Sequence, residues 1–377
     1  MAHRYADLCR SAATALDRVP ATAQPRALVG FDGFVDHIID VVATRESRTS
    51  YASIPTIAAL GEKITAAAGK SANLELVVKK SKIGGNGPIM ANALCSHGCR
   101  VTAVGILGET AIDPVFAPLA ERAEKVISLG QPAVTDALEF SDGKLMLGKL
   151  FPLEEVTYAK LLERVGGVEG IKALLRAPQG IATVNWTMTL ELTNIWENLA
   201  ADILPGLRSD RPLWFIDLAD PAKRTPGDIL AALEALKKLQ KHADVVLGLN
   251  EAECRQILAV LGLQWPAAAS EWEAAEAGCR AIREQVGLAY VMCHLVRSSA
   301  VAWIGGSASA DGFFEAKPLI TTGAGDHFNA GFLTGLLHGI APAECLQIGG
   351  ATSGHYVRTA QSPTRAQASA FLRSAAG

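Results

Sequence analysis

The chain has 377 residues, 49% of them hydrophobic, and a formal net charge of −3. This length and apolar content allow a sizeable core and exclude disorder as the main state, and the near balance of charge excludes a dedicated nucleic-acid-binding or membrane-surface protein. No apolar run approaches the roughly 18 residues of a membrane span, the charged N-terminus lacks a signal-peptide pattern, and the seven cysteines include no CxxC pair, so we expect a cytoplasmic protein with free thiols.

Short apolar runs alternate with helical segments along most of the chain. The runs expected as strands are ALVGF from residue 27, VTAVGIL from 101, GIATVNW from 180, PLWFIDLA from 212, ADVVLGLN from 243 and LAYVMCHLV from 288. Long helical segments separate most of them, such as Asp228 to Lys241 and Glu271 to Val286. This alternation predicts an α/β fold with a doubly wound, mostly parallel central sheet flanked by helices.

Two stretches break the alternation. GFVDHIIDVV from 33 and LELVVKKSKI from 74 are strand-like, and AVTDALEFSDGKLMLGKLF from 133 is typical of a hairpin with Asp142 and Gly143 at its turn. We expect these strands, within 33–84 and 133–150, to form a small β-sheet lid on a single domain of residues 1–377. Since open strand edges tend to pair, we also expect a homodimer through the lid.

The stretch TTGAGDHFNAGF, residues 321–332, places one aspartate among glycines at the start of a predicted helix. Helix N-termini present unpaired N–H groups and a positive dipole end, and glycines let an anion such as phosphate come close to them. Asp326 would repel that phosphate unless it accepts a proton from a hydroxyl that attacks it. The stretch therefore predicts phosphoryl transfer; the alternative is a capping residue after a tight glycine turn.

Three further segments carry polar residues or tight turns. NEAE places Asn250 and Glu253 after a predicted strand, at the sheet edge where acids can hold Mg²⁺ and its waters, although an ordinary capping box fits them equally. FDGFVDHIID spaces its aspartates evenly, so Asp32, Asp36 and Asp40 share one face of an extended strand and could accept sugar hydroxyls; the alternative is a solvated edge. KIGGNGPIM is a glycine turn before a helix that lets a ligand approach the backbone.

In this order, the acidic strand, the GG turn, NxxE and TxGAGDxFxAGF resemble the ribokinase family, the PfkB-type carbohydrate kinases, from about residue 28 to about residue 363. The resemblance implies an α/β core with a β-lid, ATP as donor, Mg²⁺, and a sugar-type hydroxyl as acceptor. It implies that Asp326 is the catalytic base and that the amides of Gly323, Ala324 and Gly325 form an anion hole. It assigns sugar binding to Asp36, Asp32, Gly84, Gly85 and Asn86, and Mg²⁺ binding to Glu253. It assigns the nucleotide phosphates to Asn250, Glu253, Thr322, Lys223 and Arg224. For Lys223 and Arg224, the alternative is a role as ordinary surface residues.

Two positions depart from the family pattern. Ile320 stands where relatives carry an aspartate that helps to bind a monovalent cation, which argues against K⁺ dependence. Ile89 stands where relatives commonly carry an asparagine that touches the sugar, which predicts a different sugar or one held differently.

Other functions stay open beside an ATP-dependent sugar kinase. A nucleoside kinase would need a base pocket, for which Phe31, Phe34 and Trp186 are candidates. A sugar-phosphate acceptor would need converging cations, for which the candidates are Lys79, Lys80, Lys82 and Lys144. A non-catalytic sugar- or nucleotide-binding regulator is the alternative outside the enzymes. The sequence does not name the acceptor.

Overall fold

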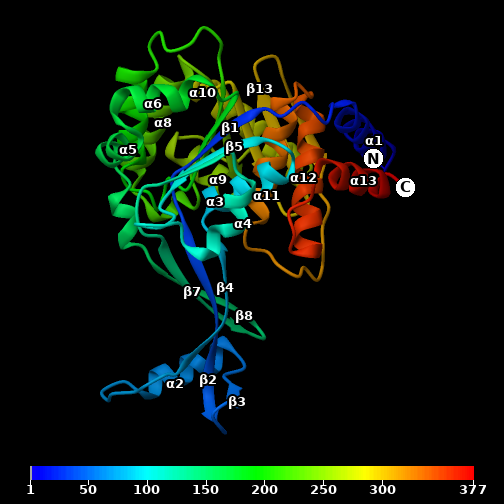
Figure 1. The fold of residues 1–377 in the computed structure, drawn as a ribbon. Helices are drawn as coiled ribbons and strands as arrows, with labels where there is room; N and C mark the ends of the chain where they lie inside the picture. Colours follow the sequence, from blue (N-terminus) through cyan, green and yellow to red (C-terminus); the bar gives the residue numbers. More distant parts are fainter. Residues whose placement is uncertain (1) are drawn as a thin grey trace.

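The computed structural model describes residues 2–377, which fold around a nine-stranded sheet with helices on both faces (Figure 1). Its strands, in spatial order, are β14 (Gly306–Asp311), β13 (Ser298–Trp303), β12 (Tyr290–His294), β11 (Asp244–Asn250), β10 (Leu213–Asp217), β9 (Gly180–Thr183), β1 (Arg26–Gly30), β5 (Arg100–Gly105) and β6 (Lys125–Ser128). All strands from β12 to β6 run parallel, while β13 and β14 form an antiparallel edge. The predicted α/β class with a mostly parallel sheet is confirmed.

Alternate residues of the strands pack into two cores, one on each face of the sheet. On β10, Trp214 and Ile216 join one buried cluster, whereas Phe215 between them joins the other. The first cluster includes side chains of α5 (Tyr158–Val165), α6 (Gly167–Arg176), α7 (Leu192–Asn198), α8 (Pro226–Gln240), α9 (Glu251–Val260) and α10 (Glu271–Val286). The second includes side chains of α3 (Asn86–Ser96), α4 (Ala117–Arg122), α11 (Ala324–Leu337) and α12 (Pro342–Thr359). Strands that are apolar throughout are stable here because helices cover both of their faces.

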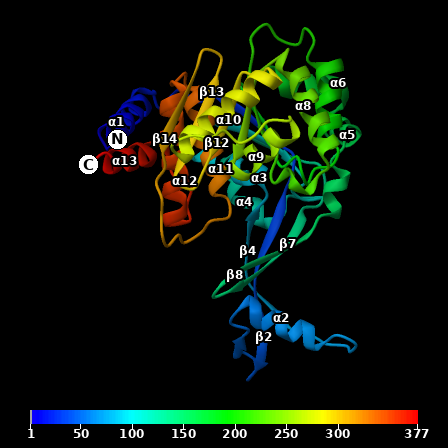
Figure 2. The same ribbon diagram turned by 180° about the vertical axis from the view of Figure 1, so that it is seen from behind.

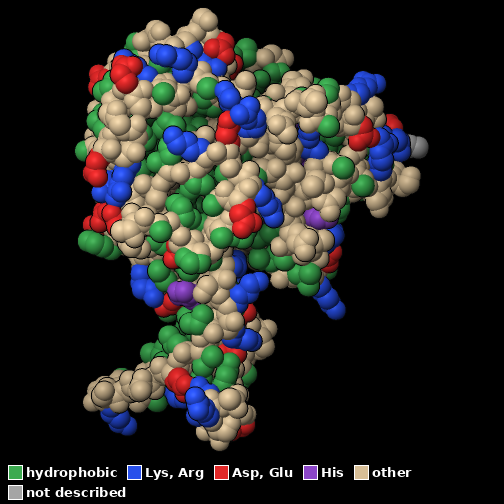
Figure 3. Space-filling view, viewed as in Figure 1, with side chains coloured by type: hydrophobic (Ala, Val, Ile, Leu, Met, Phe, Trp, Pro, Cys, Tyr) green, Lys and Arg blue, Asp and Glu red, His purple; other side chains and the backbone are tan. Residues whose placement is uncertain are grey.

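A second, five-stranded sheet projects from the main body. It consists of β2 (Phe34–Arg45), β3 (Tyr51–Ser53), β4 (Leu76–Gly84), β7 (Ala133–Phe140) and β8 (Gly143–Lys149), with α2 (Ile57–Ala66) at its far end (Figure 1). The space-filling view shows it as a narrow extension, with charges of both signs scattered over the visible face (Figure 3). Its strands fall in the two segments from which a small lid sheet was expected.

The β7–β8 hairpin differs in one detail from the prediction. Phe140 pairs with Gly143, so Ser141 and Asp142 form the turn and the predicted Asp142–Gly143 turn is one residue late. The reason lies outside the hairpin, because Asp142 Oδ1 accepts a hydrogen bond of 2.9 Å from the amide of Ile57 at the start of α2. That contact ties the hairpin to α2.

The two ends of the described chain pack together on the main body. Helix α1 (Ala2–Arg18) lies against α13 (Arg365–Ala375), as both views show (Figures 1 and 2). Within residues 2–377, no helix has both the length and the apolar character that crossing a bilayer requires. All seven cysteines are free thiols, as expected, and all but Cys95 are buried.

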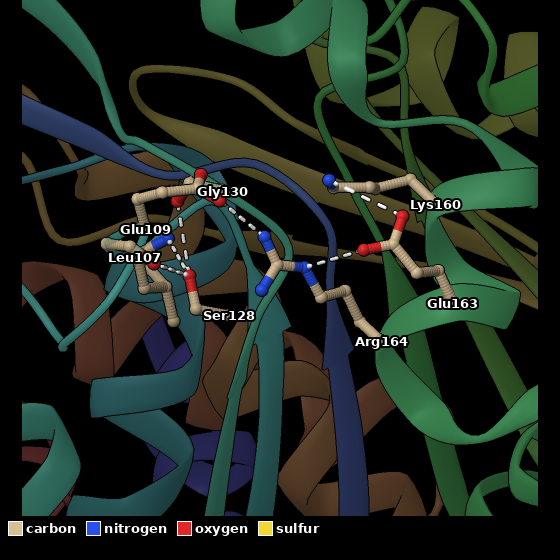
Figure 4. A network of polar contacts seen from close by, with 8 residues as sticks. Leu107, Glu109, Ser128, Gly130, Lys160, Glu163 and Arg164 are labelled. Carbon is tan, nitrogen blue, oxygen red and sulfur yellow. Dashed lines mark hydrogen bonds and ion pairs between the residues drawn. The ribbon is translucent and has the colours of Figure 1, made fainter.

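A polar network fixes the loop that follows β5 (Figure 4). The Ser128 hydroxyl, at the end of β6, accepts a 3.0 Å hydrogen bond from the amide of Leu107, and Arg164 of α5 bonds Glu109 at 2.6 Å. The carbonyl of Ile106 approaches Gly33 so closely that a Cβ on Gly33 would lie 2.3 Å from its oxygen. Only glycine fits such an approach, so this network holds the backbone on which the second sheet begins.

Candidate active site

The carboxyl ends of the parallel strands meet the start of α11, and a buried carboxylate lies there. Gly323 forms the N-cap of α11 with a φ of 93°, a left-handed conformation that favours glycine. Asp326 follows in the first turn and is 8% exposed. The side-chain amide of Asn86 donates a 2.9 Å hydrogen bond to Asp326 Oδ1, which leaves Oδ2 without a side-chain partner in the described chain.

The three amides expected as an anion hole differ in their hydrogen bonds. The N–H of Ala324 donates to the carbonyl of Thr321 at 3.1 Å, closing the turn. Those of Gly323 and Gly325 donate to no acceptor among residues 2–377, and no side chain caps the helix. Two unpaired donors therefore stand at the positive end of the α11 dipole, next to Asp326.

Other buried acids lie near Asp326 or beside its neighbour Asp217. Asp32, Asp217 and Glu253 are all less than a tenth exposed, and the charges of Asp217 and Asp32 both act on Asp326. Burial first, and then the charges of Asp217 and Asp32, hold the pKa of Asp326 well above its ordinary value. Burial also raises the pKa of Asp32 to about 6, and burial together with Glu253 raises that of Asp217 to about 8.

Neutral amides compensate these acids. Asp32 accepts from the amides of Gly87 at 2.7 Å and Asn86 at 2.9 Å and from the side chain of Asn185 at 2.8 Å. It therefore caps the start of α3. Since β2 begins only at Phe34, the expectation that Asp32 shares a strand face with Asp36 and Asp40 is wrong.

The remaining aspartates of that expected face lie on β2 in different surroundings. Asp36 is 3% exposed and lies 3.9 Å from the ammonium of Lys82. A Cβ on Gly84 would lie 2.3 Å from Asp36 Oδ1, so the first residue of the GG turn is glycine because this carboxylate packs on its backbone. Asp40 is partly exposed and pairs with Lys79 at 3.3 Å, which places it away from the buried acids.

The NEAE segment forms the capping box that its pattern allows. Asn250 Oδ1 accepts from the amide of Glu253 at 3.0 Å, and Glu253 Oε2 accepts from the amide of Asn250 at 2.8 Å. Glu253 Oε1 accepts from the amide of Asp220 at 2.9 Å, which ties the loop after β10 to α9. The cap thus brings the Glu253 carboxylate beside Asp217.

The cations expected near the phosphates have other partners. Lys223 is exposed and pairs with Asp220 at 3.2 Å. Arg224 lies over the ring of Trp186 at 4.5 Å and pairs with Asp228 at 3.4 Å.

A cavity of about 670 Å³ opens in front of the α11 start. Its polar end includes Asn250, Thr321, Ala324 and Gly325. Its other walls are largely apolar or aromatic and include Leu295, Val296, Phe313, Phe314, Pro318, Phe328 and Val357. A flat apolar group can lie between those walls while an anion attached to it faces the unpaired amides of Gly323 and Gly325.

Several site residues were not predicted from the sequence. Asp217 ends β10, and its two carboxylate oxygens accept from the amide of Ala219 and the side chain of Asn329, each at 2.8 Å. Asn185 follows β9 with a left-handed φ of 59°. A polar residue directly after an apolar strand was the available signal for both, because such residues gather at the ligand-binding edge of a parallel sheet.

Ile89 and Thr322 lie at the same turn. Ile89 is buried and would contact a Cβ on Gly323 at 3.3 Å. It therefore packs against residues 322–325 at the start of α11, called here the glycine cradle. Thr322 contributes its carbonyl, which accepts a 3.0 Å hydrogen bond from the hydroxyl of Tyr356.

Comparisons with known proteins agree with this geometry. The model of the prokaryotic ketohexokinase family matches residues 6–374. A ketohexokinase from Haloferax volcanii is 31% identical to this chain, over 98% of this chain and 96% of that protein. A carbohydrate kinase from Agrobacterium tumefaciens shares the fold at 17% identity with a TM-score of 0.61, covering 93% of this chain and 97% of that one. The ribokinase of Arabidopsis thaliana, solved with ribose and ATP, shares it at 18% identity with a TM-score of 0.58, covering 93% and 99%.

The predicted resemblance to ribokinase-type kinases is therefore confirmed. Fold and sequence together make this protein a carbohydrate kinase, a phosphotransferase whose acceptor is an alcohol group. Within that class, the chain belongs to the prokaryotic ketohexokinase family.

The raised pKa of Asp217 predicts a pH-dependent effect of Asp217→Asn on stability. Because the folded protein holds this proton up to about pH 8, against 3.8 for an ordinary aspartate, the wild type loses stability as pH rises through that window. Because asparagine cannot ionise, the Asp217→Asn variant does not lose this part of its stability as pH rises. We expect the melting temperature of Asp217→Asn, relative to wild type, to rise from pH 5 to pH 8. The exposed Asp202→Asn is the control, and a difference that is constant with pH would contradict the argument.

Proposed function

We propose that this chain is an ATP-dependent ketohexokinase, which transfers the γ-phosphoryl group of ATP to a hydroxyl of a ketohexose. The observation that carries the proposal is a buried carboxylate, Asp326, beside the unpaired amides of Gly323 and Gly325 at a helix start. Membership of the prokaryotic ketohexokinase family and the 31% identical relative support a ketohexose as acceptor.

Asp326 is the proposed base. The acceptor hydroxyl lies at the free Oδ2, while Asn86 holds Oδ1 in place. As the hydroxyl oxygen forms its bond to the γ-phosphorus, the bond from that phosphorus to the bridging oxygen breaks, ADP leaves, and the hydroxyl proton passes to Asp326. A raised pKa suits this role because a stronger base accepts the proton more readily near neutral pH.

The amides of Gly323 and Gly325 are the proposed anion hole. They would donate to the equatorial oxygens of the transferring group, where negative charge is spread in the transition state. Donors that are fixed before the reaction need no reorganisation during it, so their position at a helix start suits this role. The adjoining cavity would hold the nucleotide, with its apolar walls around the base.

The acids around Asp217 suit a divalent cation. Asp32 and Asp217 lie buried near Asp326, with Glu253 beside Asp217, and none of the three pairs with lysine or arginine in the described chain. A cation bound here would supply the missing positive charge and favour the ionised carboxylates. Among the side chains that the structure describes, no three of His, Cys, Asp or Glu converge to hold a metal by themselves. This fits Mg²⁺, which keeps several waters and binds through one or two carboxylates and substrate phosphates. Asp217 and Glu253 would hold it, and Mg²⁺ would neutralise phosphate charge.

Two alternative acceptors fit the side chains less well. The aromatic residues available for a nucleoside base, Phe31, Phe34 and Trp186, are all buried in the hydrophobic core. Of the lysines available for a second phosphate, Lys79, Lys82 and Lys144 each pair with a different carboxylate. The buried Asp36 beside the GG turn instead suits a neutral polyol, because its carboxylate can accept hydrogen bonds from the hydroxyls.

Substitution of the base tests the proposal. In Asp326→Asn, we expect kcat to fall by roughly 10²–10⁴, because only the proton acceptor is lost, while the dissociation constants of ATP and sugar change little. The assay measures ADP release from ATP and Mg²⁺ with D-fructose, other ketohexoses, aldoses, nucleosides and sugar phosphates, and Asp202→Asn is the control. Undiminished turnover in Asp326→Asn would refute the base. ATP binding without turnover on any acceptor would favour a regulator.

We also propose that the second sheet is a lid over the sugar and joins two copies of the chain. Leu76, Val78, Met146 and Leu147 on its strands β4 and β8 are all more than two-fifths exposed, which favours association. The expected mass in solution, by light scattering, is that of a dimer of the 39.6 kDa chain. A monomeric mass at micromolar concentration would contradict this.

A further inference from the structure

Two side chains hold the carbonyls of the glycine cradle in front of α11. The hydroxyl of Tyr356, on α12, donates to the carbonyl of Thr322 at 3.0 Å. The ring nitrogen Nδ1 of His327, on α11, lies 2.7 Å from the carbonyl oxygen of Gly323. The two rings stack on each other, with centroids 3.6 Å apart and planes 13° apart. Both residues are buried, so they form a rigid wall behind the cradle.

The tautomer of His327 follows from its partners. A carbonyl oxygen only accepts, so Nδ1 carries the proton and donates to Gly323. Burial lowers the pKa of His327 to about 4, so the ring is neutral and Nε2 is an acceptor. The Ser362 hydroxyl, 2.8 Å from Nε2, donates to it and in turn accepts from the side chain of Asn92 at 3.1 Å. In this series of hydrogen bonds, from Asn92 through Ser362 and His327 to Gly323, each donor thus has an acceptor.

Because the peptide group is planar, a bond that fixes a carbonyl also fixes the direction of the N–H in the same peptide. In a trans peptide the C=O and N–H bonds point in opposite directions. The hydroxyl that holds the Thr322 carbonyl on one side therefore directs the N–H of Gly323 to the other side, where it has no acceptor in the described chain. The next peptide is held at both ends. The carbonyl of Gly323 accepts from both the ring Nδ1 and the backbone amide of His327, at 2.7 and 3.1 Å, and the amide of Ala324 donates to the carbonyl of Thr321.

Without these contacts the cradle would have little to fix it. Gly323 adopts a left-handed φ of 93° that glycine leaves easily, and the residues before and after it have small side chains. An anion hole is effective only when its donors are already aimed at the developing charge. The orientation of the free Gly323 amide therefore depends on the atoms that hold its peptide.

We propose that Tyr356 and His327 are positioning residues of the phosphoryl transfer, which aim the Gly323 amide at the transferring group through the carbonyls of Thr322 and Gly323. The inference rests on the proposed function, in which this amide belongs to the anion hole. Neither side chain needs to touch a substrate. Their contribution lies in the transition state, because the amide would contact the phosphoryl group most strongly there.

Tyr356→Phe tests the inference, because it removes the hydroxyl and keeps the ring on His327. Loss of a whole oxyanion-hole donor costs about 10²–10³ in kcat, so a donor that is present but no longer aimed should cost about tenfold. We expect kcat with ATP and D-fructose to fall about tenfold while both KM values stay within about twofold. The matched control is Thr352→Val on the same helix, which loses a buried hydroxyl and its contacts with the carbonyl of Ile348 at 2.7 Å and with Nε2 of His97 at 3.3 Å, neither of them a contact of Thr322 or Gly323.

A second pair of variants keeps the test informative if Tyr356→Phe folds poorly. His327→Ala removes the side-chain donor to the Gly323 carbonyl and leaves the backbone amide of residue 327, which also donates to it at 3.1 Å. His327→Asn replaces the lost donor with a side-chain amide that can reach the same carbonyl. We expect kcat of His327→Asn to exceed that of His327→Ala several-fold, although both lose the ring stacking. Equal kcat values in the two variants, or a kcat of Tyr356→Phe equal to that of Thr352→Val, would overturn the inference.

Asp326→Asn, assayed in parallel, separates this inference from the proposed function. Turnover that survives Asp326→Asn would refute the proposed base. Loss of turnover in Asp326→Asn together with a wild-type kcat in folded Tyr356→Phe would refute only the positioning role.

Discussion

The burial of several carboxylates around the start of one helix is the constraint on which the structure depends. Asp32, Asp217, Glu253 and Asp326 lie within the protein, where burial raises all four pKa values and neighbouring acids raise those of Asp217 and Asp326 further, so each needs hydrogen-bond donors to remain there. The donors are amides of loops and helix ends. Holding the acids therefore fixes the start of α3 and the loop after β10.

The rest of the fold serves this arrangement. The parallel strands bring segments from β1 to β11 to one edge, and α11 adds a helix dipole and unpaired amides there. The network around Ser128 and Arg164 fixes the loop against Gly33, where the second sheet leaves the body. Buried charge, free backbone donors and the proposed sugar-binding surface thus meet at one place although they come from distant parts of the chain.

The sequence predicts what depends on local patterns. Asp326 and the glycines before it form a contiguous motif, and apolar runs identify the parallel strands, so the fold class and the proposed base were within reach. Asp217 was not, because its importance comes from Asn329, which is 112 residues away, and from neighbouring acids. Asp32 was expected on a strand face, but the amides that it accepts belong to a helix start more than fifty residues later. Only tertiary packing determines such contacts.

The most direct test of the central claim is the pH dependence of kcat/KM for the wild-type protein. Since kcat/KM reports ionisations of the free enzyme, a buried base with a raised pKa predicts an acidic limb well above pH 3.8, the ordinary value for an aspartate. Below that limb, activity should fall about tenfold per pH unit while the protein stays folded. A kcat/KM that stays constant down to the pH at which the protein unfolds would contradict the account, because Asp326 would then not need to lose its proton.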